Sequence, residues 1–504
     1  MKTQRRNALL LTVSTAAVAA GLAGVPTTQA QAATTLKWRP CVQEKGPSGQ
    51  ECAELTVPVD YRQPDGERTT LAVSRIRSER PEARRGTLLV VPGGPGGSGV
   101  QRLTDKGKAL AKELKGAYDL VALDPRGVRG SARAGCGLAP EDRDLVNLRP
   151  WPGRNGDISG NVARARRIAD ACSRNGGPLV GSMTTANEVQ DIEQFRQALG
   201  EEKISAWGVS YGTYVAAQYA QKYQEHTDRV VLDSSGDPDP SRVARGWAAN
   251  MSQAMEDRFP DFARWAAAPE QKELRLAQRP EDVRPMFLAL AERLDRQPKP
   301  TAEQDPDGRR KPGKVRLDGN RLRQALQQTL YGNDFTPLAE LIRDARDPRR
   351  TPVLPPYLAR PLPDEDAAVT VATICNDVRW PRSVRSYARD VAADRARYPL
   401  TAGMPVGVFP CAFWKNDAAG KPVRLTPDGP SNVLMIQNLR DPSTPYFGAL
   451  KMREALGQRA RLVTVDGGGH GVYLGNGNAC GDRAVTGYLV DGKRPDADAY
   501  CPAP

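Results

Sequence analysis

Ser210, Asp441 and His470 are residues of the types that carry out acyl transfer with a serine nucleophile. Ser210 is central in "GVSYG", residues 208–212, with a glycine two positions before it and another two positions after it. A serine needs such neighbours when it lies on a strand-to-helix turn that is too tight for flanking side chains. The spacing alone is weak because 47 of the 504 residues are glycine, but a strand signal precedes it and a helix signal follows. We therefore predict that Ser210 is a nucleophile.

A serine nucleophile needs a general base, and the chain contains only 2 histidines. His226 lies between the helix after Ser210 and the next strand, at the amino edge of a parallel sheet and away from the chemistry. His470 follows a strand directly in "VTVDGGGHGVYL", which places it at the same edge as Ser210. We predict that His470 is the base and that His226 is a surface or packing residue.

The base needs a carboxylate to orient it, and Asp441 follows the strand in "NVLMIQNLRDPSTP" at that same edge. Asp466 is the rival, but it lies four residues before His470 in the same loop, where a turn-forming role explains it. Thr444 is either a brace for the acid loop or an ordinary turn residue. The order Ser210, Asp441, His470 along the chain is also typical of hydrolases that carry their serine on such a turn.

The oxyanion that forms during acyl transfer needs backbone N–H donors. The stretch "LLVVPGGPGGSG", residues 88–99, is a strand that runs into a glycine-rich turn, and such a turn presents N–H groups without obstruction. We predict Gly94 and Tyr211 as the two donors. A phosphate-binding loop is the alternative, but neither the Walker spacing nor the dinucleotide-binding glycine pattern is present.

The segments that must position these residues alternate between strand and helix. Short apolar runs ending at Gly, Pro or Asp predict buried parallel strands at 71–76, 87–91, 119–124, 204–208, 230–233, 433–437 and 461–465. Helical patterns lie between them at 104–115, 161–175, 187–199 and 212–223. This order predicts an α/β fold with a mostly parallel central sheet and helices on both faces.

The middle of the chain interrupts this alternation. It has helical stretches at 241–268, 281–296, 320–331 and 337–346, the last with Thr336 as its N-cap, and proline-rich connectors at 297–314 and 346–366. We therefore predict a helical insert within one α/β domain rather than a separate domain. The predicted parts are a signal peptide at 1–32, the core at 33–238, the insert at 239–400 and the rest of the core at 401–504.

The N-terminus has the pattern of an export signal. Lys2, Arg5 and Arg6 precede an apolar run at 8–25, and residues 30–32, "AQA", offer small side chains for cleavage. A membrane anchor is the alternative, but the run is rich in Ala, Gly, Ser and Thr and would span a bilayer weakly. The paired arginines leave the export route open. We expect a secreted, extracellular protein without a stable membrane anchor.

The 8 cysteines, an even number, fit a protein that is oxidised outside the cytosol. The sequence alone leaves their pairing open, and pairing of neighbours, which closes the shortest loops, is our working hypothesis. Because the cysteines are scattered without a C-x-x-C pair and histidines are few, we expect no metal site. The hypothetical pairs are Cys41 with Cys52, Cys136 with Cys172, Cys375 with Cys411, and Cys480 with Cys501.

The formal net charge of +13 is compatible with binding to nucleic acid or to an anionic surface. The arginines are spread along the chain, however, and no known nucleic-acid-binding motif occurs. A solvated basic surface on a secreted enzyme explains the charge, and we expect no nucleic-acid partner.

Seven motifs occur in order along the chain: "PGGPGGSG", "DLVALDPRGVRGSA", "GVSYGTYVAAQYAQKY", "RVVLDSSGDP", "ICND", "DPSTP" and "GGGHG". Together they resemble the motifs of the secreted tripeptidyl aminopeptidases, which are serine peptidases related to the proline iminopeptidases. The resemblance implies the α/β-hydrolase fold, a helical cap formed by the insert, a TAP-like C-terminal segment and pairing of neighbouring cysteines. It also implies release of short peptides, typically tripeptides, from free N-termini without a cofactor. Pro92 stands where proline iminopeptidases usually have a histidine. This difference argues against an enzyme that releases single proline residues.

An aminopeptidase also needs a carboxylate for the α-ammonium of its substrate. Asp377 is our first candidate and Glu188 our second, although a surface salt bridge explains either residue equally well. A carboxylesterase acting on small acyl esters, a proline-type aminopeptidase and a non-catalytic binding protein are the alternatives. The intact serine, histidine, aspartate and glycine loop disfavour the last. We expect a monomer whose partners are the N-termini of peptides or proteins.

Overall fold

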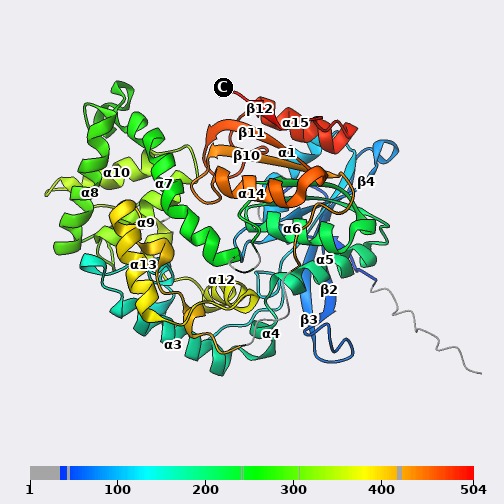
Figure 1. The fold of residues 1–504 in the computed structure, drawn as a ribbon, viewed down its shortest axis with the longest axis horizontal. Helices are drawn as coiled ribbons and strands as arrows, with labels where there is room; N and C mark the ends of the chain where they lie inside the picture. The colour runs from blue at the N-terminus through cyan, green and yellow to red at the C-terminus, as the bar shows by residue number, and fades with distance from the viewer. Residues whose placement is uncertain are drawn as a thin grey trace, which may run out of the picture. The chain divides into compact units, whose positions relative to one another are not determined.

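Ten strands form one sheet in the order β1-β2-β3-β5-β4-β6-β7-β10-β11-β12 (Figure 1). The pairings β1–β2, β2–β3 and β3–β5 are antiparallel, and all pairings from β5 to β12 are parallel. This mostly parallel sheet confirms the predicted α/β fold. The strands are β1 (Arg39–Pro40), β2 (Gln50–Pro58), β3 (Arg68–Ile76), β4 (Gly86–Val91), β5 (Tyr118–Leu123), β6 (Ile204–Val209), β7 (Thr227–Asp233), β10 (Val433–Arg440), β11 (Ala460–Gly468) and β12 (Ala499–Cys501).

The computed structural model describes residues 35–42, 46–239, 241, 243–305, 307–416 and 423–503. The predicted signal peptide at 1–32 lies outside these residues. Within them, no helix combines the length and the apolar character needed to cross a bilayer.

All seven predicted strands are present, but β1, β2 and β12 were missed. Strand β2, "QECAELTVP", places polar and apolar residues in turn and pairs antiparallel with both of its neighbours. We searched for the unbroken apolar runs of strands buried on both faces, and an antiparallel strand near the edge of a sheet does not have one.

Helices cover both faces of the sheet. Leu88 and Val90 of β4 pack with α1 (Gly99–Leu114) and α15 (Ala479–Asp491) on one face. Leu89 and Val91 pack on the other face with the cluster that includes residues of three further helices. Successive side chains of a strand point to opposite faces, so one apolar run supplies both halves of the core. The three helices are α5 (Thr185–Leu199), α6 (Tyr211–Lys222) and α14 (Tyr446–Leu456).

Helices also fill the chain between β7 and β10, where the insert was predicted. Residues 297–314, predicted as a loop, contain the hairpin of β8 (Ala302–Gln304) and β9 (Arg310–Pro312). Thr336 is not the N-cap: Phe335 holds that position, and the side chain of Asp334 accepts from the N–H of Thr336 at 3.0 Å. The helices are α7 (Val243–Ala267), α8 (Pro280–Arg296), α9 (Gly319–Leu330), α10 (Thr336–Arg346), α11 (Pro356–Ala359), α12 (Asp364–Asp377) and α13 (Val384–Arg397).

A second, earlier stretch of chain packs with these helices. It contains α2 (Leu145–Leu148), α3 (Ser159–Asn175) and α4 (Gly177–Gly181), and α4 lies beside α12 (Figure 1). One apolar cluster joins Cys172 and Val180 to Val369. The indole N–H of Trp151 donates to the side chain of Gln324 at 2.8 Å. The helical region is therefore built from two separate parts of the chain, and the predicted boundaries at 239 and 400 stay predictions.

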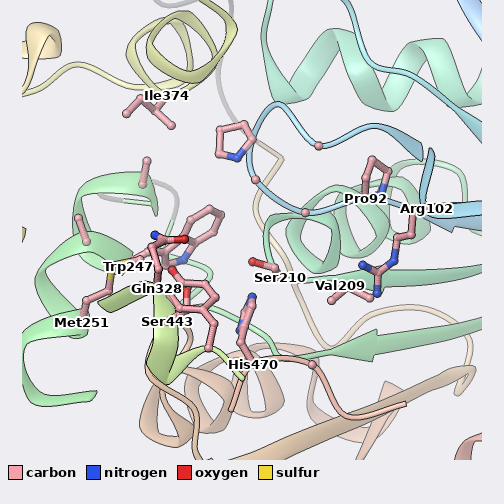
Figure 2. Close-up of a pocket in the computed structure, with 18 of the residues that line it drawn as sticks. Pro92, Arg102, Val209, Ser210, Trp247, Met251, Gln328, Ile374, Ser443 and His470 are labelled. Atoms are coloured by element: carbon pink, nitrogen blue, oxygen red, sulfur yellow. The ribbon is translucent and has the colours of Figure 1, made fainter. Parts of the chain in front are cut away.

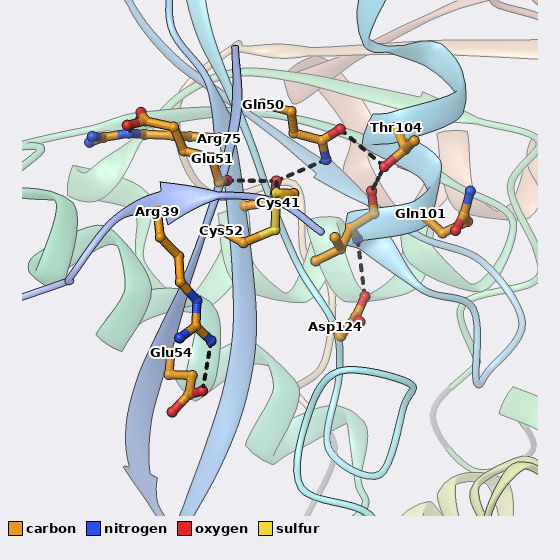
Figure 3. The surroundings of a disulfide bond; sticks show 12 residues. Arg39, Cys41, Gln50, Glu51, Cys52, Glu54, Arg75, Gln101, Thr104 and Asp124 are labelled. Carbon is orange, nitrogen blue, oxygen red and sulfur yellow. Dashed lines mark hydrogen bonds and ion pairs between the residues drawn. A yellow bond between two sulfur atoms is a disulfide. The ribbon is translucent and has the colours of Figure 1, made fainter. Parts of the chain in front are cut away.

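Four disulfides join the cysteines in sequence order, which is the hypothetical pairing. The first, Cys41–Cys52, ties the segment after β1 to β2 beside a chain of polar contacts (Figure 3). In that chain Thr104 of α1 donates to Gln50, and Gln50 donates to Ser74 of β3 at 2.9 Å. The antiparallel end of the sheet is thus fastened to α1, the helix that follows the glycine-rich turn.

Candidate active site

Ser210 lies on an abrupt turn between β6 and α6, with backbone angles φ 60° and ψ −127° that L-residues rarely adopt. The flanking residues must be glycines because neighbouring backbone atoms leave no room for a side chain. A Cβ added to Gly208 would lie 2.3 Å from the carbonyl oxygen of Gly212, and one on Gly212 would lie 2.5 Å from that of Pro92. The predicted strand-turn-helix junction is therefore present, and its strain holds the serine at the carboxyl edge of the sheet.

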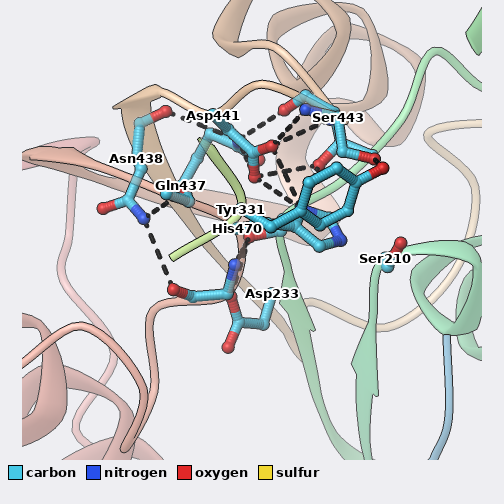
Figure 4. A network of polar contacts seen from close by, with 12 residues as sticks. Ser210, Asp233, Tyr331, Gln437, Asn438, Asp441, Ser443 and His470 are labelled. Carbon is cyan, nitrogen blue, oxygen red and sulfur yellow. Dashed lines mark hydrogen bonds and ion pairs between the residues drawn. The ribbon is translucent and has the colours of Figure 1, made fainter. Parts of the chain in front are cut away.

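Asp441 and His470 follow the adjacent strands β10 and β11 and meet at this edge (Figure 4). Nδ1 of His470 lies 2.9 Å from Oδ2 and 3.0 Å from Oδ1 of Asp441. Because an ionised carboxylate only accepts hydrogen bonds, this contact places a proton on Nδ1 and leaves Nε2 to accept another. The ring of His470 is directed toward Ser210 in Figure 4.

The carboxylate of Asp441 is fully buried and is held by its own loop. Oδ1 accepts from the N–H groups of Ser443 at 2.8 Å and Thr444 at 2.9 Å, and Oδ2 accepts from the hydroxyl of Thr444 at 3.1 Å. These donors fix the orientation of the carboxylate toward His470. The same hydroxyl lies 3.4 Å from Nδ1 of His470, so Thr444 contacts both residues, as a brace would.

A second buried carboxylate, Asp233 at the end of β7, holds the loop that follows His470. Oδ1 accepts from the N–H of Val472 at 2.8 Å, and Oδ2 accepts from the N–H of Tyr473 at 3.0 Å. The neighbouring hydroxyl of Ser234 accepts from one more N–H of this loop at 2.9 Å. We missed Asp233 in the sequence, although its place as the last residue of the strand predicted at 230–233 was the signal.

Two opposing effects act on the imidazole. Burial by itself lowers the pKa of His470, but the nearby carboxylates of Asp441 and Asp233 outweigh burial and leave the pKa above its ordinary value of 6.5. The charge of Arg102 acts in the same direction as burial. The carboxylates of Asp441 and Asp233 therefore stabilise the imidazolium form of His470, which arises when this residue accepts a proton.

The two rival residues lie away from the cavity that Ser210 and His470 share. His226 is half-buried in a short turn before β7, with Nδ1 3.2 Å from the carbonyl oxygen of Glu202. Asp466 forms an ion pair with Arg440 at 2.8 Å. The position of His226 agrees with the prediction that it is a surface or packing residue.

The cavity has a volume of about 720 Å³ and opens on Ser210, His470 and the glycine-rich turn (Figure 2). Its far wall comes from the helical region and is largely apolar. This volume suits a ligand the size of a short peptide. The apolar side chains of that wall are Trp247, Met251, Ile374, Trp380 and Phe409.

Of the two predicted oxyanion donors, Gly94 belongs to the glycine-rich turn and Tyr211 directly follows Ser210 in the chain. A Cβ on Gly93 would lie 2.9 Å from Cβ of Ser210, so the glycine-rich turn passes directly beside the nucleophile, and Gly94 lines the cavity. Tyr211 is the first residue of α6, where a backbone N–H has no acceptor within the helix. Their role in binding an oxyanion stays a prediction.

The two acids predicted to bind the substrate ammonium lie together in a buried cluster beside Tyr211. Glu188 accepts from the hydroxyl of Tyr211 at 3.0 Å, and Asp377 accepts from the N–H and the hydroxyl of Thr185 at 2.8 and 2.6 Å. Burial raises the pKa of Glu188 to about 8 and that of Asp377 to about 6. Neither is among the residues that line the cavity, so the structure does not bring them to Ser210.

Known proteins are similar in sequence to this chain over nearly its whole length. Over 486 residues the chain is 32% identical to the tripeptidyl aminopeptidase of Streptomyces lividans, covering 92% of this chain and 86% of the relative. This chain belongs to the tripeptidyl aminopeptidase family. The family model described as TAP-like protein matches residues 399–501, which include Asp441 and His470. As a member of this family, the protein is an enzyme, a serine hydrolase of the α/β-hydrolase fold.

Other relatives of this tripeptidyl aminopeptidase family member carry different names. The serine protease Hip1 of Mycobacterium tuberculosis is 27% identical over 489 residues, which is 92% of this chain and 91% of the relative. Carboxylesterase B of the same species is 30% identical over 474 residues, with 89% and 86% covered. Among solved structures, a proline iminopeptidase of Mycobacterium smegmatis is 15% identical, with a TM-score of 0.38 and coverage of 87% and 98%.

Proposed function

We propose that this enzyme is a secreted serine exopeptidase that releases short peptides, chiefly tripeptides, from free N-termini. The observation that carries the proposal is the hydrogen bond between Asp441 and His470, because His470 and the strained Ser210 line the same cavity. The identity to a tripeptidyl aminopeptidase supports the choice of peptides as substrates.

The proposed reaction begins when Nε2 of His470 takes the proton of the Ser210 hydroxyl, which attacks the carbonyl carbon of the scissile bond. Hydrogen bonds in resting active sites are often long and tighten only with substrate bound. The N–H groups of Gly94 and Tyr211 stabilise the oxyanion. His470 then gives its proton to the leaving amine, and Asp441 stabilises the imidazolium throughout. Water releases the acyl group by the same steps.

The acid limb of the pH profile tests the roles of His470 and Asp441. Because a general base must be neutral, we expect kcat/KM to be low at acid pH and to rise through an apparent pKa above 6.5. In Asp441→Asn we expect kcat to fall roughly 10⁴-fold. The acid limb of the remaining activity should move to lower pH, because the negative charge that raises the pKa of His470 has been removed. Asp466→Asn, a surface carboxylate, is the matched control and leaves the limb in place. An unmoved limb in Asp441→Asn contradicts the assignment.

A carboxylesterase is the second candidate, and one observation favours it. None of the described residues that line the cavity is an aspartate or glutamate, so no carboxylate there is placed to receive an α-ammonium. An ester substrate needs no such group. The 30% identity to carboxylesterase B is a second reason to keep this candidate, and a proline-type aminopeptidase is a third.

Secretion is supported by the four disulfides, which form and persist in oxidising compartments. The proposal also includes the export signal predicted at 1–32, the cap predicted at 239–400 and a monomeric enzyme. Reduction of the purified protein should lower its melting temperature, since each disulfide restricts the unfolded chain.

Three chromogenic substrates test the proposed function: an aminoacyl anilide, a tripeptidyl anilide with a free amine, and the same tripeptide with a blocked amine. We expect the free tripeptide to give the highest kcat/KM. Equal cleavage of the blocked and free tripeptides rules out recognition of the ammonium. Cleavage of nitrophenyl esters without cleavage of any anilide establishes the esterase instead.

A further inference from the structure

The charged side chains that line the cavity beside Ser210 are all cationic. Arg102, Lys106 and Arg149 contribute to its wall, and no aspartate or glutamate does so among the described residues. An aminopeptidase is expected to bind the ammonium of its substrate with a carboxylate. This cationic lining instead favours an anionic group on the substrate.

Arg102 lies in the first turn of α1, and its guanidinium is 4.8 Å from the ring centre of Trp207. Its Nε is buried without a hydrogen-bond partner. Asp233 and Asp105 act on it through space. The oxygens of Asp233 already accept from two backbone N–H groups, and Asp105 accepts from the side-chain amide of Gln101 at 2.9 Å. The guanidinium therefore lines the cavity with donors that its described neighbours do not occupy.

Lys106 follows one helical turn later, so the two cations stand on the same side of α1. Its Nζ donates to the carbonyl oxygen of Leu474 at 2.7 Å, four residues after His470 in the chain. An ammonium has three donors, so this contact fixes the position of Nζ and leaves two donors for a ligand.

These two cations lie on the side of the cavity where the leaving group must be. His470 has to protonate the leaving amine, and the loop that follows His470 is the one that Lys106 contacts. Arg102 is near enough to His470 for its charge to act on the ring. In Figure 2, Arg102 and the wall that includes Trp247 and Met251 lie on opposite sides of Ser210.

We propose that Arg102 and Lys106 form a subsite for a carboxylate carried by the leaving group. The cavity then has two ends: an apolar wall that receives the acyl part of the substrate and a cationic wall that receives an acid just beyond the scissile bond. This proposal rests on the proposed peptidase function, in which the leaving group is an amino acid or peptide. Charge-assisted contacts of this kind give both affinity and orientation.

The carboxylate has two possible sources in a peptide: the C-terminal carboxylate of a single leaving residue, or an acidic side chain in the first leaving position. Two matched pairs separate them. The first pair is Ala-Ala-Ala-Ala with a free C-terminus and the same peptide amidated. The second is Ala-Ala-Ala-Asp amide and Ala-Ala-Ala-Asn amide. We expect the acid to be hydrolysed with a kcat/KM about tenfold higher or more in at least one pair, and the preference to fall with added salt.

The variants Arg102→Gln and Lys106→Gln identify the subsite. Each should reduce the preference for the acid several-fold, measured as the ratio of kcat/KM for the acid to kcat/KM for its neutral partner. Lys108→Gln removes the same charge from an exposed position of the same helix and should keep the full preference. If Arg102→Gln does not fold, as a lower melting temperature or yield will show, Lys106→Gln carries the test, because the described contact of its Nζ is with a single carbonyl oxygen.

Equal hydrolysis of acid and neutral partners in both pairs overturns the subsite while leaving the peptidase intact. A preference that survives both variants overturns it as well. If no peptide is hydrolysed, the proposed peptidase function is wrong. The subsite is then tested separately with ester substrates. Acyl esters of 4-hydroxybenzoate and of 4-hydroxybenzamide form the matched pair, and the subsite requires the former to react faster in the parent enzyme and not in the variants.

Discussion

We expect Ser210→Ala to lower kcat by roughly 10⁴–10⁶-fold, because members of a catalytic triad act as a unit. Alanine fits the site: Ser210 already adopts φ 60° with a Cβ, so the substitution adds no new backbone strain. The melting temperature should therefore stay close to that of the parent. Turnover of the free tripeptidyl anilide and labelling by a fluorophosphonate probe are the two measurements.

Ser159→Ala is the matched control for this variant. Ser159 is exposed at the start of α3, where its hydroxyl donates to Asp157 at 2.7 Å, and it does not line the cavity. It should keep full activity and full labelling. Retained turnover in Ser210→Ala, with the melting temperature unchanged, removes Ser210 from the mechanism.

The second large effect is expected from the two histidines. His470→Ala should lose roughly 10⁴–10⁶-fold in kcat, since the serine then has no group to take its proton. His226→Ala should keep kcat within about twofold of the parent value, because this half-buried side chain does not line the cavity and substitutions away from functional contacts usually have small effects. The pair removes the same side chain at two positions of one chain, so it separates the chemical role from any general effect of losing an imidazole. Similar losses in both variants contradict the assignment of the base.

The sequence predicts most of the sheet and the order of the active residues because both follow from one rule. Strands such as β4 and β6, buried on both faces, are unbroken apolar runs, and the residues after their carboxyl ends meet at one edge. Ser210, Asp441 and His470 are recognisable for that reason. Strand β2 does not obey this rule, and it was missed.

Other parts of the site depend on contacts that local patterns do not encode. Asp233 acts on backbone N–H groups about 240 residues further along the chain, as its bonds to Val472 and Tyr473 show. Glu188 and Asp377 are acids of a suitable type, yet packing directs them into a buried cluster. Arg102 and Lys106 are two of 72 basic residues, and only the turn of α1 beside the loop of His470 distinguishes them.

The helical region matters for anyone who wishes to transplant a specificity from one relative to another. Its first part precedes the nucleophile in the chain and its second part follows β7, and side chains such as Trp151 and Gln324 interlock the two. An exchange limited to the stretch after β7 would pack the second part of the helical region from one protein against the first part from another, at a buried interface. A chimaera should therefore carry both halves together, each with its own disulfide, Cys136–Cys172 in the first and Cys375–Cys411 in the second.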